Sequence, residues 1–535
     1  MKHRDFKHAD FHDANRRPAY GRAGMAATSH PLATLTAIDV LRAGGNAIDA
    51  AIAAAALQGV VEPQMTGIGG DCFVLYAPKS GGVIAMNGSG PAPKRADVEW
   101  FRRQGIESID GQSPHAVTVP GCVAAWARLA ADHGTKSLGE LLQPAIRAAA
   151  DGYVVTPRVA ADWAVDGERL TRDPNAAAVY LPDGKVPRVG DLHRQPALAR
   201  TLTAIAKDGT KAFYSGEVAE DMVRHLNALG GLHAMEDFAA YAPEYTAPIK
   251  TNYRGYDVFE CPPNGQGIVV LMILNVLAGF DLAALPPLSA ERFHLQMEAG
   301  RIAYRDRNAL LADPRHAKVP VDQMLSAAHA DAMRAHIKRD RTMATLPPSP
   351  FPTHKDTVYL CVVDGQGNAV SFINSIFDGF GSGIVALKSG VLLHSRGSSF
   401  VLDPSHPNCI APGKRPMHTI IPGLVQKDGK TVMPFGVMGG QYQPVGQVNF
   451  LTNVIDYGMD PQTALNQPRA FHWDGQANLE HGIPEATAAG LAKLGHEVGR
   501  IDRPYGGGQA IWIDRESGAL VGGSEPRKDG MALGY

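Results

Sequence analysis

Few residues in this chain have types and spacing that support chemistry on their own. The glycine-rich stretch Gly67-Ile68-Gly69-Gly70-Asp71 has the composition of a phosphate-binding loop. It follows a predicted helix and precedes a predicted strand, which is the reverse of the order in dinucleotide-binding and P-loop motifs. We therefore expect a tight turn with close backbone approach at this stretch, and no nucleotide site.

A threonine hydroxyl stands at the start of the other notable stretch, Asp356-Thr357. Residues 358–363 are apolar on both faces of an extended chain, which is typical of a buried strand. Residues 364–368 predict a tight connection, and residues 369–375 predict the returning strand. From these residues alone the segment is a core hairpin, and a chemical role for Thr357 stays open.

Metal binding finds little support in the sequence. The five cysteines are scattered without Cys-x-x-Cys spacing, so neither a disulfide framework nor a zinc site is predicted. The terminal histidines His3, His8 and His12 lie in a polar segment, where histidines usually bind nothing specific. We expect no metal and no organic cofactor.

Composition limits the class of protein. The 535 residues include 51 Lys+Arg and 53 Asp+Glu, with a formal net charge of -2, so no basic surplus indicates nucleic acid. A hydrophobic share of 45% and a charged share of 19% predict a folded chain with a substantial core and a small-molecule or peptide substrate. The N-terminal segment has no apolar stretch of a signal peptide, and no run of about 18 apolar residues predicts a membrane span. We expect a cytoplasmic location and no membrane partner.

The predicted elements form a layered pattern. A helix should begin at Pro31 and end at Gly44-Gly45, and Asn46 should cap a second helix that is apolar almost all round. Further helical spacing covers residues 138–150, 218–229, 290–307 and 321–337. Strand-like runs cover residues 383–387, 390–394, 419–421 and 423–425, and helices follow near residues 460–465 and 484–494. This order predicts layered sheets covered by helices.

Seven motifs in family order resemble the γ-glutamyltransferase family of N-terminal-nucleophile hydrolases, from about Gly21 to Tyr535. They are Gly44–Ala51, Thr66–Asp71, Thr357 with Val362–Asp364 and Gly367–Val370, Phe380–Gly383, Gly413–Pro416, Met438–Gly440 and Ser524–Arg527.

The resemblance implies an α/β fold, a four-layer αββα sandwich, made as one precursor that cuts itself between Asp356 and Thr357. Residues 1–356 would be the helix-rich large subunit, with a leader at 1–20 and a proline-rich linker at 343–355 that looks exposed. Residues 357–535 would be the small subunit that carries the nucleophile, and two processed copies could pair.

The resemblance also assigns catalytic roles. Cleavage would free an α-amine on Thr357, and such an amine has a pKa of about 7.7–8.0, close to the optimum for a general base. Thr357 would then supply nucleophile and base together. Ser375 would support its hydroxyl, and the backbone N–H groups of Gly439 and Gly440 would form the oxyanion hole.

The substrate pocket departs from the family pattern. Ser89 stands where relatives carry the arginine that holds the substrate α-carboxylate, and Ser399 stands where they carry the aspartate that holds the α-amino group. Phe377 replaces an asparagine, His418-Thr419 replaces a serine pair, and the loop between Phe400 and Arg415 is short. Without its ion partners a free amino-acid head group would be buried at a cost of several kcal/mol, so ordinary γ-glutamyl transfer should be weak.

These observations predict an autoprocessed amidohydrolase or acyltransferase that acts through an acyl-enzyme on Thr357. Two substrate classes stay open, γ-glutamyl compounds such as glutathione and non-glutamyl acidic amides of the oxamate or cephalosporin type. Arg396 is a candidate anchor for the acidic group of the second class, because a guanidinium matches carboxylate geometry. The rival hypothesis is an unprocessed member of the family that binds a ligand without catalysis.

Overall fold

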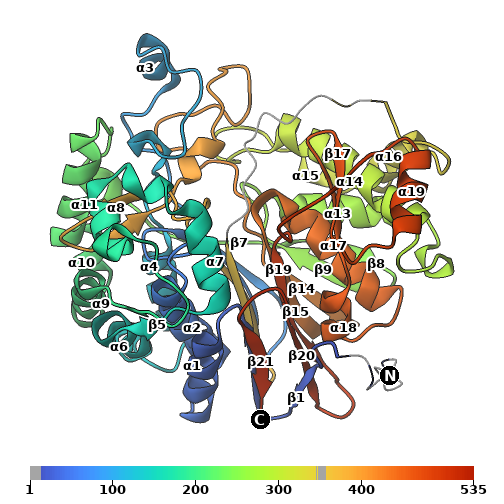
Figure 1. Cartoon of the computed structure of the whole chain (residues 1–535), viewed down its shortest axis with the longest axis horizontal. Helices are drawn as coiled ribbons and strands as arrows, with labels where there is room; N and C mark the ends of the chain where they lie inside the picture. Colours follow the sequence, from blue (N-terminus) through green and yellow to red (C-terminus); the bar gives the residue numbers. More distant parts are fainter. Residues whose placement is uncertain (1–5, 7–11, 13, 345, 347–356) are drawn as a thin grey trace.

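Two seven-stranded sheets packed face to face form the centre of the molecule, and helices cover both outer faces (Figure 1). The computed structural model describes residues 6, 12, 14–344, 346 and 357–535. The predicted αββα sandwich is confirmed. Asp356 and most of the proline-rich linker at 343–355 lie outside the described residues, so the expectation of an exposed linker is not tested.

Both sheets contain strands from before and after Thr357. The first sheet has the order β21 (Met531–Gly534), β2 (Gly24–Thr28), β10 (Val358–Asp364), β11 (Ala369–Ser375), β3 (Asp71–Ala77), β4 (Ile84–Gly88) and β7 (Glu244–Thr246). The second has the order β1 (Ala19–Gly21), β20 (Leu520–Ser524), β19 (Gly507–Ile513), β15 (Lys430–Met438), β14 (Gly423–Lys427), β9 (Tyr256–Glu260) and β8 (Ile249–Tyr253).

One helical layer covers the first sheet, and it comes from the N-terminal part of the chain (Figure 1). Its main helices are α1 (Pro31–Arg42), α2 (Ala47–Val61), α4 (Cys122–His133), α6 (Gln143–Asp151), α9 (Pro196–Asp208), α10 (Thr210–Tyr214) and α11 (Glu217–Ala228). Every residue of α2 is buried, as its apolar composition predicts, and Asn46 and Asp49 form a capping box at its start.

The other helical layer covers the second sheet and contains helices from both parts of the chain (Figure 1). They are α13 (Gly267–Leu277), α14 (Ala290–Leu310), α15 (Val321–Met324), α16 (Ala327–His336), α17 (Gln443–Ile455), α18 (Pro461–Asn466) and α19 (Glu485–Lys493). Short strands lie outside the main sheets: β12 (Ile384–Ala386) with β13 (Val391–Leu393), and β16 (Ala470–Trp473) with β17 (Gln476–Leu479) and β18 (Glu497–Arg500).

The alternation predicted for residues 358–363 is confirmed by the core. Tyr359, Cys361 and Val363 belong to the apolar layer between the two sheets. Leu360 and Val362 belong to the core between the first sheet and its helices. A side chain one residue before Val358 therefore faces the gap between the sheets, as Tyr359 does.

No helix among the described residues is both long enough and apolar enough to cross a bilayer.

Candidate active site

The ends of four neighbouring strands bring the candidate residues to one edge of the first sheet. In the antiparallel pair β10–β11, Val358 lies opposite Asn374, so Thr357 comes level with Ser375. Ser375 lies opposite Asp71 in the next pair. Ser89 follows Gly88 at the end of the fourth strand, beside the start of β3. Residues far apart in sequence therefore form a row of polar side chains.

The glycine-rich stretch before Asp71 is the tight turn that its composition predicts. A side chain at Gly70 would place its Cβ 2.3 Å from the carbonyl oxygen of Ser375, and one at Gly69 would come 2.1 Å from the carbonyl oxygen of Leu392. Only glycine permits such close backbone approach. The turn holds Asp71 against the strand that carries Ser375.

Thr357 and Ser375 form the hydroxyl pair of the site. Their oxygens lie 3.2 Å apart, and both side chains are buried. Ser375 Oγ accepts hydrogen bonds from the backbone N–H of Phe377 at 2.9 Å and from Nη2 of Arg396 at 3.2 Å. A hydroxyl has two acceptor lone pairs and one hydrogen, so the hydrogen of Ser375 points to Thr357 Oγ1. This bond favours a threonine oxygen that carries negative charge.

Arg396 is a buried cation beside this pair. It begins the short 3₁₀ helix η5 (Arg396–Ser399) and is 0% exposed. Its Nη1 donates to Thr419 Oγ1 at 2.8 Å, and its guanidinium lies 3.9 Å from the ring centroid of Phe377. Within the described part of the chain no carboxylate forms an ion pair with Arg396, and its Nε has no hydrogen-bond acceptor.

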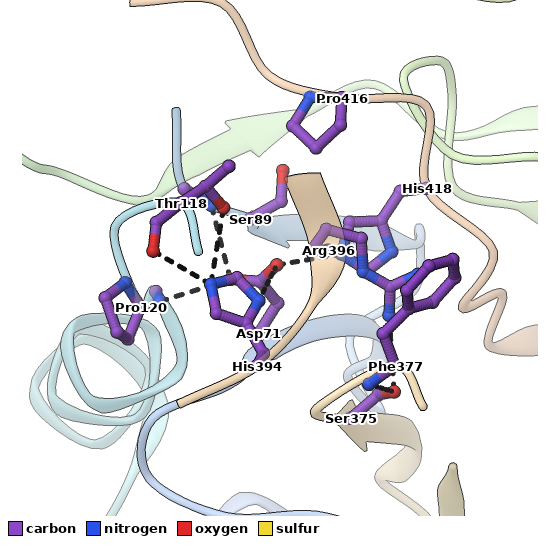
Figure 2. Close-up of polar contacts among 12 residues, drawn as sticks. Asp71, Ser89, Thr118, Pro120, Ser375, Phe377, His394, Arg396, Pro416 and His418 are labelled. Atoms are coloured by element: carbon purple, nitrogen blue, oxygen red, sulfur yellow. Dashed lines mark hydrogen bonds and ion pairs between the residues drawn. The ribbon is translucent and has the colours of Figure 1, made fainter. Parts of the chain in front are cut away.

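A carboxyl group lies between two imidazoles next to Arg396 (Figure 2). His418 Nε2 lies 3.0 Å from Asp71 Oδ2, and His394 Nδ1 lies 3.5 Å from the same oxygen. His394 Nε2 donates to the carbonyl oxygen of Thr118 at 2.9 Å, so a neutral His394 presents a lone pair at Nδ1. This lone pair faces the carboxyl of Asp71 and has no hydrogen-bond donor among the described residues.

Burial sets the protonation of this cluster. Removal from water raises the pKa of Asp71 to about 7, although Arg396 and the N–H groups of Gly90 and Gly121 act against that rise. Burial lowers the pKa of His394 to about 3, and burial together with Arg396 lowers the pKa of His418 well below its ordinary value. Burial also lowers the pKa of Arg396 to about 9. At neutral pH the site therefore contains one cation and one carboxyl that is partly protonated.

Gly439 and Gly440 lie at the end of β15, the strand of the second sheet that faces β10. Their φ angles are +124° and +56°, which favours glycine. Gln266 Nε2 donates to the carbonyl oxygens of Gly440 and Thr419, at 3.1 and 2.9 Å. Because Thr419 Oγ1 accepts from Arg396, this glutamine ties the glycine turn to the pocket.

The remaining predicted pocket residues are buried, but their contacts differ. Ser89 Oγ donates to Asn87 Oδ1 at 2.7 Å and accepts from Asn264 at 3.2 Å, so this hydroxyl is bound within the protein. The hydroxyl of Ser399 is buried and has no partner among the described residues. Thr419 holds Arg396, and His418 holds Asp71, so neither serves as a simple replacement of a serine.

The sequence reasoning missed the roles of Asp71 and His394. Asp71 ends the glycine-rich motif Thr66–Asp71, and an acidic residue directly after two glycines is the available signal. No sequence signal indicated that His394 and His418 meet this carboxyl, because these contacts join positions more than 320 residues apart.

Comparison with known proteins agrees with this geometry. The model of the family described as gamma-glutamyltranspeptidase matches residues 33–535. The structure resembles the crystal structure of a cephalosporin acylase from Bacillus halodurans with a TM-score of 0.93, at 40% identity over 99% of both chains.

Curated relatives cover nearly the whole chain. A glutathione hydrolase-like proenzyme, YwrD, from Bacillus subtilis is 36% identical and covers 96% of this chain and 99% of its own. An oxamate amidohydrolase proenzyme from Klebsiella pneumoniae is also 36% identical, over 96% of this chain and 98% of its own. The fold and these relatives define an amide-hydrolysing enzyme of the N-terminal-nucleophile class. Within that class, the chain belongs to the gamma-glutamyltranspeptidase family.

Proposed function

We propose that this protein is a self-processing amidohydrolase with Thr357 as its N-terminal nucleophile, and that its substrate carries an acidic group on the acyl side. The position of Thr357 before a central strand, its contact with Ser375 and the proenzyme names of the relatives support the processing step. The buried Arg396 supports the choice of substrate.

Self-cleavage follows from the chemistry of the threonine. Thr357 Oγ1 attacks the carbonyl carbon of Asp356, and the C–N bond breaks as its nitrogen takes up a proton. Water then hydrolyses the resulting ester. The products are a carboxylate on Asp356 and a free α-amine on Thr357, which is the base that the hydroxyl needs for later turnovers.

Catalysis uses the same hydroxyl on an external amide. The α-amine takes the hydroxyl proton, Oγ1 attacks the amide carbonyl, and the N–H groups of Gly439 and Gly440 stabilise the oxyanion. The proton then passes to the leaving amine as the C–N bond breaks. Water, or an amine acceptor, resolves the acyl ester on Thr357.

The surroundings of Arg396 are the main support for the proposed class of substrate. Its guanidinium contacts the hydroxyl that touches Thr357, it is fully buried, and its Nε has no acceptor. A buried cation without an ion-pair partner is favourable for an anionic ligand. A carboxylate bound there would lie close to the reacting carbonyl, so short acidic acyl groups, as in oxamate or succinamate, fit best.

Hydrolysis of γ-glutamyl amides is the second candidate, because a relative of this length and identity is named glutathione hydrolase-like. Ser89 and Ser399 stand where the family pattern has its head-group partners, and the hydroxyl of Ser89 is already bound to Asn87 and Asn264. The site therefore offers little to hold an α-amino-acid head group.

Two measurements test the proposal. Intact mass and N-terminal sequencing of the purified protein, beside Thr357→Ala, should give two fragments that meet between Asp356 and Thr357, and only the 56.9 kDa chain in the variant. The processed enzyme should hydrolyse oxamate or succinamate faster than glutathione, and Ser89→Arg with Ser399→Asp should shift the preference toward glutathione. An uncut chain under all conditions would favour the non-catalytic binding protein.

A further inference from the structure

Two imidazoles and a carboxylate meet outside the candidate active site, where α14 approaches the residue that precedes β18. His294 and Glu298 lie one helical turn apart on α14 and so share a face. His496 comes from the other part of the chain. All three side chains are buried, and one ligand atom of each lies within 4.8 Å of the others.

The hydrogen bonds of His294 orient its free nitrogen into this cluster. Its Nε2 donates to the carbonyl oxygen of Lys338 at 2.6 Å, which leaves a lone pair on Nδ1. That Nδ1 lies 2.8 Å from Nε2 of His496. A backbone carbonyl that fixes the second nitrogen of a histidine is the usual outer contact of a metal-binding imidazole.

At this distance the two nitrogens share one proton, and a tetrahedral Zn²⁺ ion bound to both, with Zn–N bonds of about 2.0–2.1 Å, needs them about half an ångström farther apart. His496 Nε2 carries this proton, because His294 Nδ1 is the acceptor, and the neutral imidazole is the form of histidine that binds metal. His496 Nδ1 has no hydrogen-bond partner among the described residues. The proton now shared with His294 is therefore held by one short contact, and its replacement disturbs no further bond of His496.

Glu298 supplies the negative charge. One oxygen accepts from Arg301 at 2.6 Å and the other from the backbone N–H of Met343 at 2.6 Å, so each oxygen keeps a lone pair. Arg301 also has the carbonyl oxygens of Met343 and Ala344 within 3.4 and 3.3 Å. The arginine can stay on these carbonyls when the carboxylate binds a dication.

We propose that His294, Glu298 and His496 form a binding site for a borderline-soft divalent metal ion such as Zn²⁺. Two imidazoles and one carboxylate are a ligand set that zinc accepts, with water in the fourth position. On binding, the metal replaces the proton on His496 Nε2 and His496 Nδ1 takes up a proton, so the imidazole stays neutral and no net proton is released. The site lies apart from Thr357 and does not depend on the proposed reaction, but it would join the two subunits, because α14 precedes the proposed cut and His496 follows it.

Metal loading of the whole processed protein tests this assignment. The background should carry His3→Ala, His8→Ala and His12→Ala, so that terminal histidines do not bind the ion. After treatment with a chelator, the protein is titrated with Co²⁺ and with Zn²⁺. The readouts are the visible absorption of Co²⁺, the bound metal by elemental analysis, and the thermal unfolding midpoint.

We expect one metal ion per chain, the intense visible absorption of a low-coordinate Co²⁺ site, and a higher Tm with Zn²⁺ than with chelator. His496→Ala and Glu298→Gln should each weaken binding by at least about tenfold, since even outer contacts of metal ligands are worth that much. The exposed control His481→Ala should bind as the parent does. Glu298→Gln keeps the shape of the side chain. If His496→Ala does not fold, the metal affinity of Glu298→Gln tests the site.

No bound metal in the parent, or a stoichiometry and Tm shift that survive both His496→Ala and Glu298→Gln, would overturn the assignment. In that event the cluster is a hydrogen-bonded histidine pair that shares one proton.

Discussion

Replacing Arg396 by methionine should remove selection for acidic substrates. Methionine keeps an unbranched, flexible side chain in the buried space but carries no charge and no donor. Thr419 Oγ1 and Ser375 Oγ each lose one hydrogen bond, at 2.8 and 3.2 Å in the structure. The carboxylate of the proposed acidic substrate would lose its cation.

The size of the expected loss in kcat/KM follows from the burial of Arg396 and from the protonation of Asp71. Removing one partner of a buried, hydrogen-bonded charge pair costs about 2–5 kcal/mol. Asp71 has a pKa of about 7 and takes up a proton when the cation is gone, so it does not remain as an unpaired buried charge. We therefore expect a loss near the lower end, about 2–3 kcal/mol, or about 30- to 150-fold in kcat/KM.

The assay compares an acidic amide with an uncharged amide of the same size. The value of kcat/KM for succinamate should fall by the stated factor in Arg396→Met, while that for butyramide should change much less. Arg172→Met, at a side chain that is 64% exposed, is the matched control and should leave both values unchanged. Adding Asp71→Asn to Arg396→Met should cost little more.

Equal losses for the acidic and the uncharged amide would refute the reasoning. They would mean that Arg396 acts only through Ser375 on the nucleophile. The rate of self-cleavage, which needs no external substrate, would then fall by the same factor.

Three further changes have defined outcomes. Ser375→Ala should slow self-cleavage and Ser375→Thr should preserve it, because only the latter retains the hydroxyl that contacts Thr357; the time course of the 56.9 kDa band measures this, and equal rates would contradict it. Folding holds a proton on Asp71 that the unfolded chain releases, so the contribution of this group to stability is full below about pH 4 and is lost as pH rises through about 7. Both proteins are compared in the uncut Thr357→Ala background. The free energy of unfolding in urea of the Asp71→Asn variant should rise relative to that of its parent as the pH goes from about 4 to about 7, by up to about 4 kcal/mol. A difference in unfolding free energy that does not change with pH would contradict this. Gly439→Ala should lower kcat by about 10²–10³, because φ is +124° and the new Cβ would lie 2.8 Å from Gly506 Cα. Gly458→Ala, where φ is also positive (+68°) but the new Cβ meets nothing within 4 Å, should cost only about 1–2 kcal/mol of stability and leave kcat unchanged.

Local patterns in the sequence predicted the central strands and the first helices. Alternation gave both faces of residues 358–363, and Asn46 marked the start of α2. The hairpin connection set the register, which brings Thr357 level with Ser375. These features depend on neighbouring residues, so the sequence carries them directly.

Some predicted elements were wrong in extent. The helix expected over residues 138–150 is divided into α5 (Leu138–Leu141) and α6, with a proline in the first turn of the second. The helix expected over 321–337 is divided as well, because Ser326 caps α16. Residues 419–421 form no strand, because their backbone groups bond to side chains: the carbonyl oxygen of Thr419 accepts from Gln266, and the N–H of Ile421 donates to Gln443.

Sequence patterns could not predict the protonation and the contacts of Asp71. Its pKa depends on burial and on Arg396, and its contacts with His394 and His418 come from chain segments that only the fold brings together. The same holds for His294 and His496, which are 202 positions apart.

The interleaved strand order has a consequence for assembly. In the first sheet β2 lies between β21 and β10, and in the second sheet β1 lies beside β20, so strands from both sides of the proposed cut pair with each other in each sheet. The two fragments cannot part without breaking both sheets. An uncut chain refolds in a first-order reaction, but a cut one must find its complement, so recovery after denaturation depends on concentration. The intact chain is thus needed once, when the protein first folds and before the first turnover. After the proposed cut, the lifetime of the active enzyme depends on how fast it unfolds and not on the equilibrium between folded and unfolded states.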